Sequence, residues 1–303
     1  GAAGLTATDL IVDVRGSGAG VENKAETSLI TLTDVTINAH DGAGIRTAVD
    51  LNSGNSGNTI NVTGAGTGYV LDNYDTSASQ LSSSFLFSDG YTVNVGNASG
   101  TATGSGVYAN TTGAVQTDGV INVLDSTGGS ALIARDAQSI LNTGEIRSVS
   151  VAGLAVVDAS GSNDKIIQND YVLEAADATQ RVIQSGAGND LVNLITAGAS
   201  TVGVINTGAG QDAFRWTAGS FRGAVEFEGT GGNNFALIQQ GDLGGVSHIM
   251  TPAADNNVLQ LSGVSGANAK VGTLPADDLS RGTNIGSGWN VINVLDSSDV
   301  RIV

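Results

Sequence analysis

A pattern of one turn and one strand recurs at a constant step in the second half of the chain. Its equivalent positions are Asp190, Asp212, Asn234 and Asn256, each set between a turn rich in Gly, Asn or Asp and a short run of mainly apolar residues. A fixed period of about 22 residues is typical of a solenoid, in which a unit buries its apolar face only by stacking on its neighbours. The unit is too short for a pair of helices, so the pattern predicts one turn of a parallel β-helix per repeat.

The glycine content agrees with this prediction. Gly accounts for 44 of the 303 residues and Pro for only 2, which favours many short strands joined by tight turns over long helices. The predicted fold class is therefore all-β, a parallel β-helix (β-solenoid) in a single domain over residues 1–303. At one coil per period the chain would form about 13 or 14 coils of about 22 residues.

Four short segments share an apolar-Asn-apolar core, at residues 59–62, 92–95, 120–123 and 291–294. Side chains alternate along a strand, so the apolar residues should point inward and the Asn outward. The step from Asn61 to Asn94 is longer than the step from Asn94 to Asn122, and both exceed the regular period, which predicts that some coils carry insertions. Residues 71–90 interrupt the pattern, and we expect a loop there from which Phe85 or Phe87 returns to the core.

The charge balance limits the possible partners. With 12 basic and 29 acidic residues the net charge is −17, which repels nucleic acid and anionic lipid surfaces. The sequence has no uninterrupted apolar run of about 18 residues, so we expect no membrane insertion of this segment. It has no Cys, and its first residues read as a mature or trimmed start.

The Gly-rich turns at residues 186–192 and 208–214 match the core of the calcium-binding β-roll motif. That motif must recur every nine residues for successive turns to share ions, whereas the step here is more than twice as long. We therefore expect structural turns, no metal and no cofactor. In this interpretation the turn carboxylates and amides form an outward row on the surface, and its members are the candidate binding residues: Asp164, Asp190, Asp212, Asn234 and Asn256.

Catalytic groups are sparse. The only histidines, His40 and His248, are about 200 residues apart, so a catalytic triad or a His-based metal site is not expected. Asp277 and Asp278, near Arg281, form an acidic pair that we interpret as a solvated turn; a polysaccharide-cleaving site is the alternative.

Bulky aromatic residues gather in the last third of the sequence. We expect core packing for most of them, with a sugar-binding stack as the alternative. The residues concerned are Phe214, Trp216, Phe221, Phe227, Phe235 and Trp289.

Residues 141–146, 185–194 and 205–212, together with the acidic, Cys-free composition, resemble the passenger domains of Gram-negative autotransporters (type V secretion). The likeness in style is closest to the self-associating adhesins of the AIDA type. It implies a right-handed parallel β-helix exported by a C-terminal barrel that has been cleaved or trimmed from this sequence. The serine-protease motif Gly-Asp-Ser-Gly of that family has no match here, since Gly241-Asp242 is followed by Leu.

The function predicted from these observations is that of a non-enzymatic adhesin at the bacterial cell surface. Polar faces of the β-helix would mediate self-association between copies on neighbouring cells, biofilm formation, or attachment to a host glycan or matrix ligand. A polysaccharide-active β-helix enzyme and a structural stalk for another domain are the alternatives.

Overall fold

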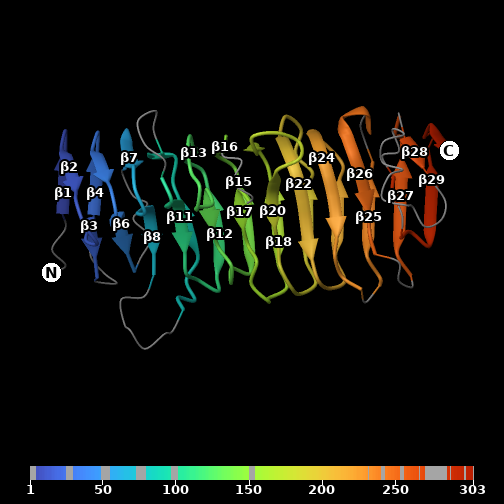
Figure 1. The fold of residues 1–303 in the computed structure, drawn as a ribbon, viewed down its shortest axis with the longest axis horizontal. Helices are drawn as coiled ribbons and strands as arrows, with labels where there is room; N and C mark the ends of the chain where they lie inside the picture. Colours follow the sequence, from blue (N-terminus) through green and yellow to red (C-terminus); the bar gives the residue numbers. More distant parts are fainter. Residues whose placement is uncertain are drawn as a thin grey trace. The chain divides into compact units, whose positions relative to one another are not determined.

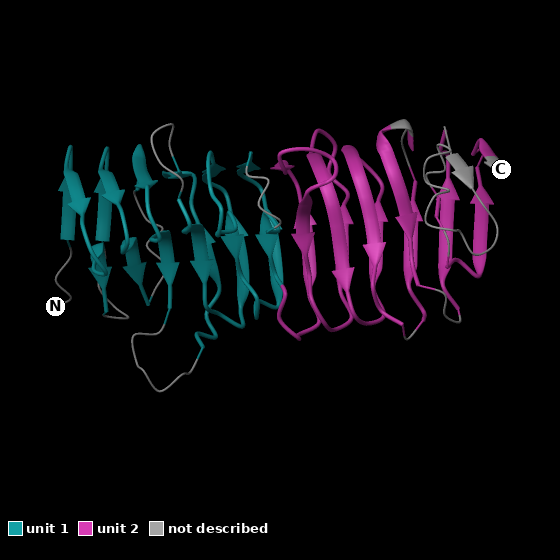
Figure 2. Cartoon of the chain, viewed as in Figure 1, with its two compact units in different colours: residues 1–159 teal, residues 160–303 magenta. Residues whose placement is uncertain are grey.

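The protein is built almost entirely of short parallel strands. The structure, a computed structural model, describes residues 5–24, 30–48, 55–72, 80–96, 102–149, 154–230, 232–239, 243–252, 256–265, 267–269, 285–286, 288–296 and 298–302. These residues form two compact units, residues 1–159 and 160–303 (Figure 2). The expected parallel β-helix is confirmed: strands follow one another along the chain as stacked coils (Figure 1).

The coils of unit 1 form three walls of parallel strands. Wall A contains β2 (Ile11–Val14), β5 (Thr36–Ala39), β7 (Asn58–Val62), β10 (Tyr91–Val95), β13 (Val120–Val123) and β16 (Glu145–Ser148). Wall B contains β3 (Ala19–Asn23), β6 (Ala43–Thr47), β8 (Thr67–Leu71), β11 (Ser105–Ala109), β14 (Leu132–Ile133) and β17 (Val157–Asp158). Wall C contains the pair β1 (Leu5–Thr8) and β4 (Ile30–Thr33), and the set β9 (Phe85–Phe87), β12 (Ala114–Thr117) and β15 (Ser139–Asn142).

Alternating side chains fill the core of unit 1. In wall A, Ile37, Ile60, Val93 and Ile121 are aligned by register and buried, while the residues on either side of each point outward. The predicted orientation of the first three Asn-centred segments is therefore confirmed. Phe85 and Phe87 both reach the core, where only one of the two was expected, and there they pack against the rings of two buried tyrosines, Tyr69 and Tyr91.

Unit 2 begins with three strands per coil and continues with two. Its wall D contains β18 (Ile166–Asn169), β21 (Leu191–Leu194), β23 (Ala213–Trp216), β25 (Phe235–Ile238), β27 (Val258–Ser262) and β29 (Val291–Leu295). On its other side β19 (Val172–Glu174) and β20 (Arg181–Gln184) both pair with one long strand, β22 (Ser200–Gly208). Wall E continues from β22 to β24 (Ser220–Phe227) and β26 (Val246–Met250). The remaining elements are the 3-10 turn η1 (Leu243–Gly245), β28 (Ala267–Ala269) and β30 (Val300–Ile302).

The length of a coil is less uniform than the sequence period suggests. The predicted period holds from Leu191 to Ala213 and from there to Phe235, where β22 and β24 each replace two strands and a corner. In wall A the coils are longer, as in the step from Ile60 to its register partner Val93. The predicted number of coils is therefore too high, because most coils use more residues than the regular period.

The fourth Asn-centred segment belongs to a different environment. Strand β29 pairs with β27 in wall D and has no counterpart among the described strands of wall A. Ile292 and Val294, which flank Asn293, are in register with the buried residues Leu259 and Leu261 of β27, although Val294 is itself 46% exposed. The register therefore agrees with the expected inward orientation of these two residues, but Asn293 lies in wall D and does not join the row of wall A.

Glycines line the corner that leads into wall B. Gly18, Gly42, Gly66 and Gly104 occupy equivalent places one coil apart, and a Cβ atom on Gly42 would lie only 1.9 Å from the carbonyl oxygen of Gly18. On Gly104 the corresponding distance, to the oxygen of Gly66, would be 1.6 Å. Gly42 and Gly104 therefore lie too close to the backbone of the preceding coil to admit any side chain.

Candidate functional site

The predicted row of turn carboxylates and amides exists, but it faces the interior. Asp190 and Asp212 are each 1% exposed, and Asn234 is fully buried. The backbone N–H of Asp190 donates to Asp212 Oδ1 (2.9 Å), and that of Asp212 donates to Asn234 Oδ1 (2.9 Å). The stacking of equivalent residues one coil apart is confirmed, whereas their predicted position on the surface is wrong. A carboxylate or amide can satisfy a backbone donor of the preceding coil only by turning inward.

Two members of the predicted row are not equivalent to the others. Asn257, rather than Asn256, accepts the bond from the N–H of Asn234 (2.9 Å), and Asn256 is exposed in a turn with φ of 64°. Asp164 is also exposed, and its Oδ1 accepts the N–H of Asn189 (2.7 Å). Asp164 therefore belongs to a second, outer row, one residue before the buried one. Constant spacing alone could not separate two adjacent rows.

Burial changes the acidity of the two inner carboxyl groups. Desolvation raises the pKa of Asp190 to about 6. Hydrogen bonds to the carboxylate and the positive charge of Lys165 act in the opposite direction but are weaker. Desolvation raises the pKa of Asp212 to about 7, although the N–H of Asp190 and the hydroxyl of Thr207 both bond to its carboxylate. The row thus contains carboxyl groups that titrate near neutral pH, followed by amides that do not titrate.

The two histidines belong to different units, and the other catalytic candidates fall outside the described residues. His40 lies in unit 1, where its ring contacts Thr63 Oγ1 (3.1 Å) and lies 3.9 Å from the carboxylate of Asp41. Asp277, Asp278, Arg281 and the Gly241-Asp242 pair lie outside the described residues. Among the residues that are described, no group of three His, Asp or Glu side chains is arranged to hold a metal.

One cluster of acid and base groups, in wall E, was not predicted from the sequence. His248 Nε2 lies 3.2 Å from Glu226 Oε1, and His248 Nδ1 lies 3.3 Å from Ser247 Oγ. The same serine hydroxyl donates to the carbonyl of Gly223 (3.0 Å), and the bond from His248 lowers the pKa of Glu226. Because the Ser247 proton is held by a backbone carbonyl, we interpret the cluster as a hydrogen-bonded network that joins β24 to β26.

The aromatic residues of unit 2 are mostly core residues, as expected. Phe214, Trp216, Phe221 and Phe227 are all less than 5% exposed. Trp289 packs edge-on against Phe227 and donates its indole N–H to the carbonyl of Ile249 (3.2 Å). The four buried rings are therefore inaccessible as a platform for a sugar.

An outer row of amides runs along wall A of unit 1 and gives this face its regular chemistry. Asn38 Nδ2 donates to Asp13 Oδ1 (2.8 Å), and Asn61 Nδ2 donates to Asn38 Oδ1 (3.0 Å). Asn94 and Asn122 continue the row through bonds of 3.1 Å each. The row follows from the aligned Asn positions of the strand segments, but Asn38 was not predicted as one of its members.

Threonines form a second column beside the amides. Thr36, Thr59 and Thr92 are in register on β5, β7 and β10, each two residues before the Asn of its strand. We call these Thr and Asn columns on wall A the Thr/Asn face. The signal that identifies it in the sequence is the triplet Thr-apolar-Asn at residues 36–38, 59–61 and 92–94.

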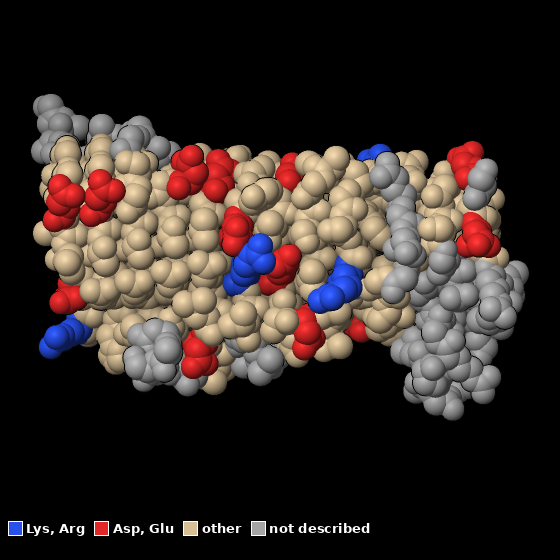
Figure 3. Space-filling model, turned by 90° about the horizontal axis from the view of Figure 1, so that it is seen from above, with Lys and Arg blue, Asp and Glu red and all other residues tan. Residues whose placement is uncertain are grey.

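The Thr/Asn face is bordered by shallow depressions. One depression, of about 580 Å³, is lined by residues that include Asp13, Asn38 and Thr63. Another, of about 410 Å³, is lined by residues that include Asn38, Thr63 and Leu124. The face of the molecule shown in Figure 3 has a broad area without Lys, Arg, Asp or Glu over the N-terminal coils, with charged side chains at its margins. Between Asp13 at one end of wall A and Glu145 and Arg147 at the other, unit 1 therefore presents an uncharged, hydrogen-bonding surface in a chain that is strongly acidic overall.

Comparison with known proteins identifies no relative: no protein-family model matches the chain, and no curated protein and no solved structure is significantly similar to it. Within the described residues no helix has the length and apolar character needed to cross a membrane.

Proposed function

We propose that the chain is a non-enzymatic adhesin of the bacterial cell surface that associates with further copies of itself through the Thr/Asn face of unit 1. The observation that carries this proposal is the continuous row of amides from Asn38 to Asn122, whose first member donates to the carboxylate of Asp13. In keeping with the resemblance to autotransporter passengers, the copies that meet would be displayed by neighbouring cells.

The hydrogen-bonding capacity of the amide row supports contact between identical surfaces. A side-chain amide has two N–H donors and an oxygen with two lone pairs, and the row uses one donor and one lone pair of Asn61 and Asn94. Each coil can therefore offer one donor and one acceptor to a partner. A second Thr/Asn face provides both at the same coil repeat of about 4.8 Å.

The strength expected of such an interface suits reversible cell contact. A single neutral hydrogen bond contributes about 0.5 to 1.5 kcal/mol net, so contacts from a few coils give only weak pairing. Many copies on two opposed surfaces raise the effective affinity without any new contact. Association between cells would then depend on the density of displayed copies.

Carboxylates placed within the Thr/Asn face should abolish the association. In the double variant Asn61→Asp, Asn94→Asp, opposed faces would bring like charges together, and we expect self-association to weaken at least about tenfold, equivalent to about 1.4 kcal/mol. The measurements are sedimentation equilibrium of the purified chain and settling of cells that display it.

The matched control is Asn189→Asp, which adds a carboxylate to the exposed row of unit 2 and keeps the acceptor used by the N–H of Gln211. It should leave self-association unchanged. If the purified wild-type chain stays monomeric and cells displaying it remain dispersed, or if the double variant associates like the wild type, the proposal is wrong.

A further inference from the structure

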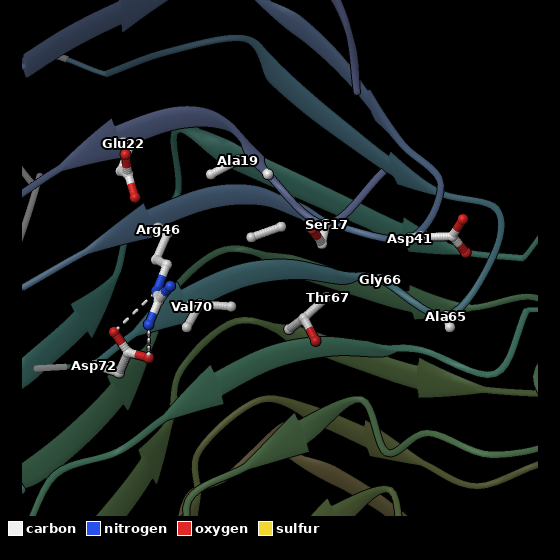
Figure 4. A pocket seen from close by; sticks show the side chains of 13 residues that line it. Ser17, Ala19, Glu22, Asp41, Arg46, Ala65, Gly66, Thr67, Val70 and Asp72 are labelled. Carbon is white, nitrogen blue, oxygen red and sulfur yellow. Dashed lines mark hydrogen bonds and ion pairs between the residues drawn. The ribbon is translucent and has the colours of Figure 1, made fainter. Parts of the chain in front are cut away.

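A second surface of unit 1, on wall B, is concave rather than flat. Ala19, Ala43 and Thr67 point outward from three successive coils and are in register. Each stands between two glycines, in the repeated sequence Gly-x-Gly that begins at Gly18 and Gly42 and recurs in the next coil. The small side chains form the floor of a groove of about 250 Å³ that crosses three coils (Figure 4).

One side of the groove is lined by a column of longer side chains. Glu22, Arg46 and Val70 are aligned three residues beyond the floor, and Tyr108 extends this column into the next coil. Arg46 forms a two-pronged ion pair with Asp72: Nε lies 3.1 Å from Oδ1 and Nη2 lies 2.8 Å from Oδ2. Figure 4 shows the guanidinium drawn toward Asp72, beside the floor of the groove.

The opposite rim is formed by the turns that precede the strands. Ser17, Asp41 and Ala65 lie there and enclose the floor from the other side. The groove therefore combines methyl groups on its floor with hydroxyl groups, carboxylates and an oriented guanidinium around it. This is the complement of a sugar ring, which presents C–H groups on its faces and hydroxyl groups that both donate and accept around its edge.

We propose that this groove binds an uncharged, linear oligosaccharide that lies along the stack of coils. The coil repeat of about 4.8 Å is close to the advance of one sugar along an extended β-linked chain, so equivalent groups on successive coils meet successive rings. The volume suits roughly one or two rings in the described groove.

The charges at the groove favour a neutral ligand. Arg46 is compensated by Asp72, and Glu22 lies 3.3 Å from the ammonium of Lys24. The remaining carboxylate, Asp41, and the net charge of −17 oppose a polyanion. This site lies on wall B and does not depend on self-association through wall A.

Filling the floor of the groove should remove the binding. Ala43→Gln places a longer side chain on the floor from an outward position, and we expect it to weaken binding of cellohexaose or N-acetylchitohexaose at least tenfold, as measured by isothermal titration calorimetry. Ala114→Gln is the matched control, because Ala114 is an outward, half-exposed alanine on wall C of the same unit. This variant should bind like the wild type, and thermal unfolding should show that both variants are folded.

An oligogalacturonate of the same length should not bind, since it is anionic. The inference is overturned if neither neutral hexasaccharide binds the wild-type chain, if Ala43→Gln binds them unchanged, or if the oligogalacturonate binds as tightly as the neutral probes. Self-association of the same variants reports on the proposed function separately, because Ala43→Gln leaves the Thr/Asn face intact.

Discussion

Substituting alanine for Gly42 is expected to destabilise unit 1 by more than about 3 kcal/mol. The added Cβ atom would lie 1.9 Å from the Gly18 carbonyl oxygen and 2.5 Å from that of Gly16, and both obstacles are backbone atoms that cannot rotate away. To relieve the clash the two coils must separate, which breaks ladder hydrogen bonds and opens the core. This cost exceeds the ordinary value of about 1 to 3 kcal/mol for an overpacked core because the strain falls on the backbone itself.

The control for this prediction lies in the same glycine column. Gly18 occupies the equivalent place one coil earlier, and a Cβ atom there would meet nothing within 4 Å. Gly18→Ala should therefore change the stability by less than about 1 kcal/mol, and loss of backbone freedom in the unfolded chain would make it slightly stabilising. Amide hydrogen exchange of strands in unit 1 measures both variants; equal protection in the two would contradict the steric argument.

The second large effect is expected from the buried carboxyl group of Asp212, as a function of pH. In the unfolded chain this group ionises near its ordinary pKa of 3.8, whereas the folded protein holds its proton up to about pH 7. Between these values the native state binds more protons than the unfolded state, so its stability falls as the pH rises from about 4 to about 7. The destabilisation is complete above pH 7.

Asp212→Asn should remove the part of this dependence that comes from Asp212 and leave the smaller part that comes from Asp190, whose pKa is raised to about 6. Asn234 shows that an amide fits the same position: its Oδ1 accepts a backbone N–H and its Nδ2 donates to the hydroxyl of Thr251 (2.8 Å). Each pKa unit corresponds to about 1.4 kcal/mol, and relaxation around the charge reduces the full shift, so we expect a gain of about 2 kcal/mol at pH 8 and little change at pH 4. The two tryptophans, Trp216 and Trp289, both belong to unit 2 and report its unfolding by fluorescence.

The reverse substitution tests the same cause. Asn234→Asp places a third carboxyl group next to Asp212 in the buried row and should lower stability at pH 8 more than at pH 4. A variant Asp212→Asn that is less stable than the wild type at pH 8, or that retains its full pH dependence, would show that the buried carboxylate is not the source of the effect.

The sequence predicts the repeating architecture well because the apolar positions recur independently of coil length. Asn61, Asn94 and Asn122 were expected to align in spite of unequal spacing, and they do. The orientation of the Asp190 row was not predictable from the same information. A polar residue beside a turn is expected to face water. An inward orientation is favourable here only because a backbone N–H of the adjacent coil donates to the side chain, and the local sequence does not reveal that donor.

The candidate surfaces were predictable to different degrees. The Thr/Asn face can be predicted from the alternation of side chains along a strand and from the triplets at residues 36–38 and 59–61. Predicting the groove from the Gly-x-Gly repeat requires the distance between the backbones of neighbouring coils. That distance cannot be read from the spacing of residues along the chain. The contact of His248 with Glu226 depends on a register shift between Gly223 and Ala224. The residue types at these positions do not predict that shift.

The direction of the buried row has a consequence for how unit 2 is assembled. The N–H of Asp190 is bonded by Asp212, that of Asp212 by Asn234, and that of Asn234 by Asn257. Each coil of the row therefore accepts the backbone hydrogen bond that the coil before it in the sequence donates. When the chain folds from its N-terminus, the last coil formed has a backbone N–H that is bonded only when the next coil is added. Each added coil thus stabilises the one before it and presents a new donor to the one that follows.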